Sequence, residues 1–209
     1  MKRNRRKQFG ILLLAVVLLF GSALPAAAAS QDVTQKYRSQ VARMCRNLDS
    51  YLGYGCGRNA VFKYDIYART TMVYFMHLYH VYRKPIKQAN KICASDMKIY
   101  FGTTKTALKK FSGRTFPRNP SYLLRNRNGK VEYIGGNWGD WIPRGRVSKV
   151  LKTGTNKYEA VYDIYYYDYY EHITYSYMGT YKIYLKKARN KYGFTITNMK
   201  RTKTNNVWI

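Results

Sequence analysis

Acidic residues are scarce in this chain. Its 209 residues include 10 Asp and Glu against 38 Lys and Arg, which gives a formal net charge of +28 at pH 7. No acidic residue occurs from Lys182 to the end of the sequence. A field of this sign favours polyanionic partners and repels other cations. Because no neighbour in the sequence neutralises the last stretch, we expect its positive charge to be open to a partner.

Signatures of catalytic and cofactor sites are also missing. No serine stands in a nucleophile elbow, and the glycine-rich stretch 135–141 has no lysine in phosphate-loop register. We interpret that stretch as a bulged bend. His77 and His80 are three residues apart, but no glutamate or third ligand follows at a metal-binding spacing. We therefore expect no cofactor, no metal and no enzymatic activity.

Long apolar runs are confined to the beginning of the chain. The basic residues 2–7 precede the apolar residues 9–24, and Pro25 then leads into the alanines at 26–29. This order is typical of a secretory signal peptide, and the uninterrupted apolar run is short for a membrane span. We predict a signal peptide over residues 1–29, with an uncleaved anchor as the alternative. The mature protein is then secreted or associated with the cell envelope and has no stable membrane span.

Cysteine is rare, and all three cysteines lie after the predicted signal peptide, at Cys45, Cys56 and Cys93. Export permits disulfides, but an odd number leaves at least one thiol free or paired between chains. The sequence does not choose between Cys45–Cys56 and Cys45–Cys93. Three scattered cysteines do not make a zinc site.

Residues 30–112 have the periodicity of helices. Over residues 30–52, apolar residues recur every three or four positions, and Ser30 or Asp32 can cap the helix. Further helices are predicted at 59–83, with a strand possible over 70–75, at 86–93, at 97–101 behind a Ser95-Asp96 cap, and at 105–111. We expect the following residues of the second helix to be in the core: Met72, Phe75, Met76 and Tyr79.

Residues 114–203 have the alternation of antiparallel strands. Asn128-Gly129 predicts a hairpin between 122–125 and 130–134. Strands are also predicted over 146–152, 160–168, 181–187 and 192–200, with a possible strand end in 205–209. The predicted inward residues are Tyr162, Ile164, Tyr166, Tyr181, Ile183, Leu185, Phe194 and Ile196. The many tyrosines fit a packed core, because tyrosine suits strands, or a surface on which rings stack.

Helices followed by five or six antiparallel strands indicate an α+β domain over residues 30–209. This order resembles the NTF2-like or cystatin-like architecture, in which a curved sheet wraps around N-terminal helices. The block GTYKIYLKKARNKYGFTITNMKRTK at 179–203 also resembles the C-terminal segment of secreted single-domain proteins of Gram-positive bacteria. The resemblance implies a cone that can hold an acid/base group in NTF2-like enzymes. The block carries no catalytic motif, so no functional residue is transferred from it.

The charge, the export signal and the interleaved tyrosines together favour a non-enzymatic module that binds anionic cell-envelope polymer or another polyanion. The predicted contact residues are Lys182, Lys186, Lys187, Arg189, Lys191, Lys200 and Arg201. One alternative is an NTF2-like enzyme or small-ligand binder with a pocket in the cone. Its candidate residues are Asp140, Asp163, Asp168, Glu171 and His172. Nucleic-acid binding is a further alternative, and the charge can also serve solubility alone. The oligomeric state is left open.

We predict that the signal peptide is cleaved after Ala27, Ala28 or Ala29, because small residues follow Pro25 there. N-terminal sequencing of the protein recovered from culture medium tests this. Protein found only in membranes, with residues 1–29 intact, contradicts the prediction.

Overall fold

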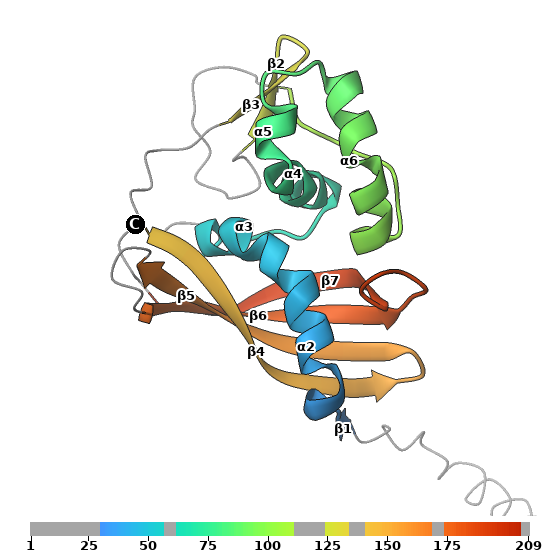
Figure 1. The fold of residues 1–209 in the computed structure, drawn as a ribbon, viewed down its shortest axis with the longest axis vertical. Helices are drawn as coiled ribbons and strands as arrows, with labels where there is room; N and C mark the ends of the chain where they lie inside the picture. Colours follow the sequence, from blue (N-terminus) through green and yellow to red (C-terminus); the bar gives the residue numbers. More distant parts are fainter. Residues whose placement is uncertain (1–29, 57–61, 111–123, 134–140, 169–173, 206–209) are drawn as a thin grey trace, which may run out of the picture. The chain divides into compact units, whose positions relative to one another are not determined.

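Four long strands follow one another in the chain and pair antiparallel with their neighbours: β4 (Trp141–Gly154), β5 (Lys157–Asp168), β6 (Thr174–Lys187) and β7 (Phe194–Thr204). The short strand β1 (Gln31–Asp32) completes the sheet in the order β1-β4-β5-β6-β7 (Figure 1). The computed structural model describes residues 30–56, 62–110, 124–133, 141–168 and 174–205. The antiparallel strands predicted over 146–152, 160–168, 181–187 and 192–200, which form a tyrosine-rich meander, are therefore confirmed.

Most of the helices precede the long strands in the chain. They are α2 (Thr34–Cys45), the 3-10 helix η1 (Arg46–Leu48), α3 (Asp49–Tyr54), α4 (Ile66–Met76), α5 (Leu78–Val81) and α6 (Ile86–Phe101). Helices α2 and α3 pack against β4, and α6 contacts β7. A separate hairpin of β2 (Leu124–Arg127) and β3 (Lys130–Tyr133) contacts α4 and α6. The α+β class is confirmed, and the NTF2-like cone stays a prediction.

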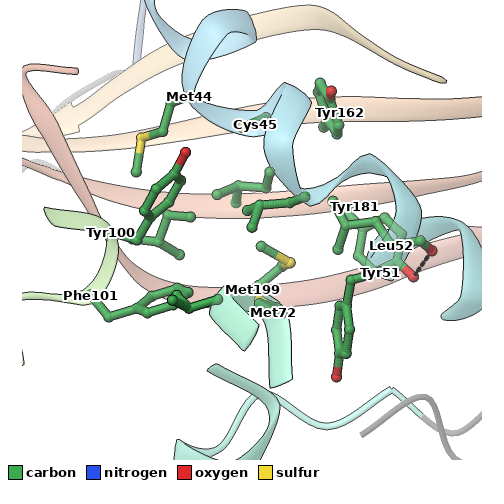
Figure 2. Close-up of a cluster of buried hydrophobic side chains, with 14 of the residues drawn as sticks. Met44, Cys45, Tyr51, Leu52, Met72, Tyr100, Phe101, Tyr162, Tyr181 and Met199 are labelled. Atoms are coloured by element: carbon green, nitrogen blue, oxygen red, sulfur yellow. Dashed lines mark hydrogen bonds between the residues drawn. The ribbon is translucent and has the colours of Figure 1, made fainter. Parts of the chain in front are cut away.

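One hydrophobic core joins the sheet to the helices. All eight residues predicted to point inward from β5, β6 and β7 are buried. Figure 2 shows Tyr162, Tyr181 and Met199 of the strands in one cluster with Met44 of α2 and Met72 of α4. The alternation of the strands thus fixes which face packs on the helices.

Hydroxyl groups of buried tyrosines connect separate elements across this core. Tyr181 donates to the carbonyl oxygen of Leu52 at the end of α3, at 2.8 Å (Figure 2). Tyr100 of α6 donates to the hydroxyl of Tyr192, beside β7, at 2.9 Å. A buried hydroxyl without a partner costs about 1–3 kcal/mol, so these bonds are what make tyrosine tolerable in the core.

Both edges of the long sheet are partly covered. At the β4 edge, the N–H of Val150 donates to Thr34 Oγ1 at 2.8 Å, and its carbonyl accepts from the N–H of Val33 at 2.9 Å. At the β7 edge, the carbonyl of Ile196 accepts from the hydroxyl of Tyr64 at 3.0 Å. Such contacts occupy backbone groups that would otherwise pair with another strand.

Several predicted helix boundaries change in the structure. The first helix begins at Thr34, whose N–H donates to Asp32 Oδ1 at 2.9 Å, and the residues before it form β1. Residues 70–75 are helical, so the possible strand there is excluded. Helix α6 runs without a break from Ile86 to Phe101, so the predicted cap at Ser95-Asp96 is wrong. Gly102 ends α6 as expected, with a positive φ of 68°.

The predicted helix over 105–111 is also wrong within its described residues, 105–110, which form no helix. Tertiary hydrogen bonds replace the helical ones there: the N–H of Ala107 donates to Thr70 Oγ1 at 2.9 Å, and Lys109 accepts from the N–H of Asn126 at 2.8 Å. Tyr79, predicted to be in the core, is 96 % exposed. The reason is that α4 ends at Met76, so the helical periodicity no longer places Tyr79 on its buried face.

The hairpin at Asn128-Gly129 is confirmed, with Asn128 and Gly129 both at positive φ, but it forms its own two-stranded sheet instead of extending the meander. Residues 135–140 of the predicted bend and 206–209 of the possible strand end lie outside the described residues. Among the helices that are described, none combines the length and the hydropathy that a membrane span needs.

Truncating Ile183 tests the inward face, because its side chain is completely buried. We expect Ile183→Ala to lower the free energy of unfolding by about 2–5 kcal/mol through lost contacts and a residual cavity. Lys186→Ala, at an exposed position of the same strand, should stay within about 0.5 kcal/mol of the parent. Urea unfolding measures both, and equal effects of the two substitutions contradict this assignment of faces.

Candidate polyanion-binding surface

The outer face of the sheet, opposite the face that packs on the helices, carries alternate residues of β4 to β7. The strand register aligns Lys149, Lys182 and Lys200 in one row, with Val161 of β5 between the first two. Adjacent strands are about 4.8 Å apart, so these ammonium groups lie within reach of one extended polymer. The basic residues of the outer face are Arg144, Arg146, Lys149, Lys157, Lys182, Lys186, Lys200 and Lys203.

Half-buried tyrosines lie between these cations. Tyr165 and Tyr177 face each other edge-on, with ring centroids 5.7 Å apart. The guanidinium of Arg144 lies 5.9 Å from the ring centroid of Tyr167. The inward tyrosines therefore confirm the packed-core interpretation. The outward tyrosines place aromatic rings among the basic groups, and stacking of a ligand on them stays a prediction.

Two acidic residues lie on the described part of the outer face, and each has a partner. Glu159 Oε1 lies 2.9 Å from Lys182 Nζ, and this hydrogen bond and the attraction between the charges raise the pKa of Lys182. Asp163 accepts a hydrogen bond from Thr180 Oγ1. The remaining cations leave the outer face with a clear excess of positive charge.

The seven residues predicted to contact a polyanion do not form one group. Lys182, Lys186 and Lys200 lie on the outer face, and Arg189 is exposed in the β6–β7 connection. Arg201 pairs with the inward Tyr181, and its Nη1 donates to the carbonyl oxygen of Gly55, directly after α3.

Besides Lys182 and Arg201, two more of the seven are held by contacts within the fold. The ammonium of Lys187 lies 4.3 Å from the ring centroids of both Tyr37 and Phe194, so it ties β6 to α2. Lys191 Nζ lies 3.7 Å from Asp96 Oδ1 on α6. No acidic residue lies within this stretch of the sequence, but Glu159 and Asp96 reach Lys182 and Lys191 from other parts of the chain and neutralise part of its charge.

Sequence reasoning missed the contribution of β4 and of the start of β5 to the outer face. Arg144, Arg146, Lys149 and Lys157 were not assigned to the site, although 146–152 was recognised as a strand. The alternation along β4 was the available signal, but only the register shows that these cations face the same way as Lys182.

Asp49 at the start of α3 is the second group that sequence reasoning missed. It is 4 % exposed and accepts hydrogen bonds from the hydroxyl of Tyr162 and the backbone N–H of Gly145. Burial raises its pKa from 3.8 to about 6, and these two hydrogen bonds oppose that rise. Its position four residues after Cys45, on the apolar side of the predicted helix, was the available signal.

Gly145 makes this arrangement possible. The ring of Tyr162 lies so close to its backbone that an added Cβ would come within 2.1 Å of the ring. The glycine thus lets the tyrosine reach across β4 to Asp49. The carboxyl group connects α3 to β4 and β5.

Other titratable groups have structural partners. His77 Nε2 lies 2.7 Å from Asp96 Oδ2, which joins the end of α4 to α6. Cys45, Cys56 and Cys93 are all buried and free, so neither of the pairings left open by the sequence is formed. No group of three or more metal-binding side chains occurs within the described ranges. Of the enzyme candidates, Asp163 is described above; Asp140, Glu171, His172 and the side chain of Asp168 lie outside the described residues.

Asp49 should make stability depend on pH. Because its folded pKa is raised above 3.8 to about 6, the folded state holds a proton between these values that the unfolded state releases. Its contribution to the free energy of unfolding therefore falls as pH rises through this window, by about 3 kcal/mol at 1.36 kcal/mol per pKa unit.

Asp49→Asn removes this titration and keeps an oxygen for Tyr162. We expect the free energy of unfolding of the variant, relative to the parent, to increase by about 2–3 kcal/mol between pH 4 and pH 7. Urea unfolding at several pH values measures the difference. Parallel pH profiles for the two proteins contradict the assignment of a raised pKa to Asp49.

Comparison of the chain with protein-family models gave no match, and a search of curated proteins gave no match either. The inferences about function therefore rest on the residues and geometry described above.

Proposed function

We propose that the protein is an exported, non-enzymatic module that binds anionic cell-envelope polymer or a chemically similar polyanion through the outer face. The observation that carries this proposal is the row of Lys149, Lys182 and Lys200 across the sheet, with further cations and half-buried tyrosines on the same face. Ammonium and guanidinium groups bind phosphate oxygens, and the tyrosine rings offer flat surfaces to sugar or base rings.

A polymer bound in this way displaces the counterions that surround it. Its affinity should therefore fall steeply as salt is added, with a log–log slope of about −0.7 to −0.9 per phosphate neutralised on nucleic acid. The affinity for wall polymers should also fall as salt is added. Nucleic acid shares this chemistry, and a comparison of polymers at equal salt separates the two kinds of ligand.

The raised pKa of Asp49 is the observation that favours the alternative of an enzyme, since acid/base catalysis needs such tuned groups. An acid or base must also come within hydrogen-bond reach of its substrate. Asp49 is 4 % exposed and already accepts hydrogen bonds from Tyr162 and Gly145. These contacts support a structural role, and we favour the binding module.

Neutralising three exposed lysines of the outer face tests the proposal. The variant Lys149→Gln/Lys157→Gln/Lys186→Gln leaves the ion pair of Lys182 with Glu159 in place. Lys187 is spared because its ring contacts belong to the fold. The matched control is Lys84→Gln/Lys87→Gln/Lys91→Gln, which removes the same charge from exposed positions at and before α6.

We expect the outer-face variant to bind poly(glycerol phosphate) and long-chain polyphosphate at least about tenfold more weakly at low salt. The reason is that a protein with fewer lysines releases fewer counterions from the polymer when it binds. The control should change much less, and both variants should unfold like the parent. Fluorescence anisotropy across a salt series, with DNA as a third polymer, measures the affinities. Equal losses in the two variants, or no binding by the parent at low salt, contradict the proposal.

A further inference from the structure

A groove of about 510 Å³ runs along the β7 edge of the sheet. We propose that it binds a single phosphate group carried on a sugar or nucleoside ring, and so seats one unit of the anionic polymer. This inference rests on the proposed function. Beyond that function, the inference specifies a subsite and the chemical class of the polymer unit that the subsite recognises.

The walls of the groove combine positive charge with apolar surface. Its lining residues are Phe62, Lys63, Tyr64, Asn198, Met199, Lys200 and Arg201. They include three cations and no acidic residue, while Phe62 and Met199 supply apolar atoms. The volume falls within the range of about 300–1,000 Å³ that is usual for small-ligand sites. A ligand that matches this lining is anionic at one end and has a compact ring at the other.

Contacts within the fold hold the two walls in place. The hydroxyl of Tyr64 donates to Ile196 of β7 at 3.0 Å, near one end of the groove. The guanidinium of Arg201 donates to the carbonyl oxygen of Gly55. The ring of Phe62 packs edge-on against the buried Tyr181, at a centroid distance of 5.0 Å. The groove is therefore preorganised, which lowers the entropy lost on binding.

Two exposed lysines approach the groove from opposite walls. Lys63 lies between Phe62 and Tyr64, and Lys200 lies on β7. Arg201 adds a charge that is present at every accessible pH. Burial raises the pKa of Tyr64, so its hydroxyl stays neutral and adds no negative charge to the groove. A phosphate group between the two lysines has charge-assisted contacts to both sides.

Lys200 links the groove to the outer face, because it belongs to the lining and also to the row with Lys182. A polymer that lies across the outer face can therefore extend over the β7 edge and place one unit in the groove. Charge alone explains attraction to any polyanion, whereas this subsite adds a preference for units that carry both a phosphate and a ring.

The test uses small ligands, because their binding to the groove does not require the whole outer face. Inorganic phosphate, glucose 1-phosphate and uridine 5′-monophosphate are titrated into the isotope-labelled protein, with glucose as the uncharged control. We expect both ring phosphates to shift the backbone amide signals of residues 62–64 and 198–201 and to bind more tightly than inorganic phosphate. Glucose should cause no shift. The tighter of the two ring phosphates identifies a glycosyl or a nucleoside unit.

Lys63→Glu is the variant of choice, because Lys63 is exposed and lies outside the outer face. We expect it to weaken ring-phosphate binding by about fivefold or more, since it places a like charge beside the ligand. The control Lys91→Glu makes the same charge change at an exposed position on α6 that does not line the groove, so it should stay within about twofold. The outer-face variant should keep ring-phosphate binding, which separates this inference from the proposed function.

Three results overturn the inference. One is the absence of shifts in the groove at millimolar ring phosphate. Another is equal affinity for inorganic phosphate and both ring phosphates, which would show that the ring contributes nothing to binding. The third is equal weakening by Lys63→Glu and Lys91→Glu, which shows attraction to net charge only. A parent that binds long polymers but none of these ligands keeps the proposed function and loses the subsite.

Discussion

The fold depends on satisfying the hydroxyl groups of a core built with tyrosine. Tyr162 bonds to Asp49, Tyr181 to Leu52 and Tyr64 to Ile196, and each bond joins a residue of the sheet to the helical part or to the segment before α4. Aliphatic side chains would bury similar apolar area without demanding these partners. The demand is directional, so the tyrosines fix how the helices lie on the sheet as well as burying their rings.

This constraint also determines what the outer face can carry. Because the inward positions of β5 and β6 are taken by tyrosine and aliphatic side chains, the strand alternation leaves lysine, arginine and the remaining tyrosines outside. Lys187 marks the limit of this division, since its ammonium lies among the rings of Tyr37 and Phe194 near the end of β6. A basic residue in this part of the chain is thus available to a partner only where the register places it outward.

Local periodicity was enough to predict the strands and their inward residues, because one buried face imposes a period of two. It was not enough for residues 105–110, where Thr70 and Asn126 supply partners from elsewhere, or for Tyr79, which follows the end of α4. The candidate site was predicted in part for the same reason. Lys182, Lys186 and Lys200 follow from alternation, but the cations of β4 join them only through strand pairing.

The scarcity of acidic residues acquires a structural meaning from their contacts. Every acidic side chain that the structure describes accepts a hydrogen bond or forms an ion pair. These residues are Asp32, Asp49, Asp65, Asp96, Glu132, Glu159 and Asp163. Asp32 and Asp65 bond to backbone N–H groups at helix starts, whereas Asp49 holds α3 to the sheet. Only Glu159 and Asp96 among these residues pair with lysines of the last part of the chain. The basic field of the outer face therefore follows from how the acidic residues are placed as well as from their small number.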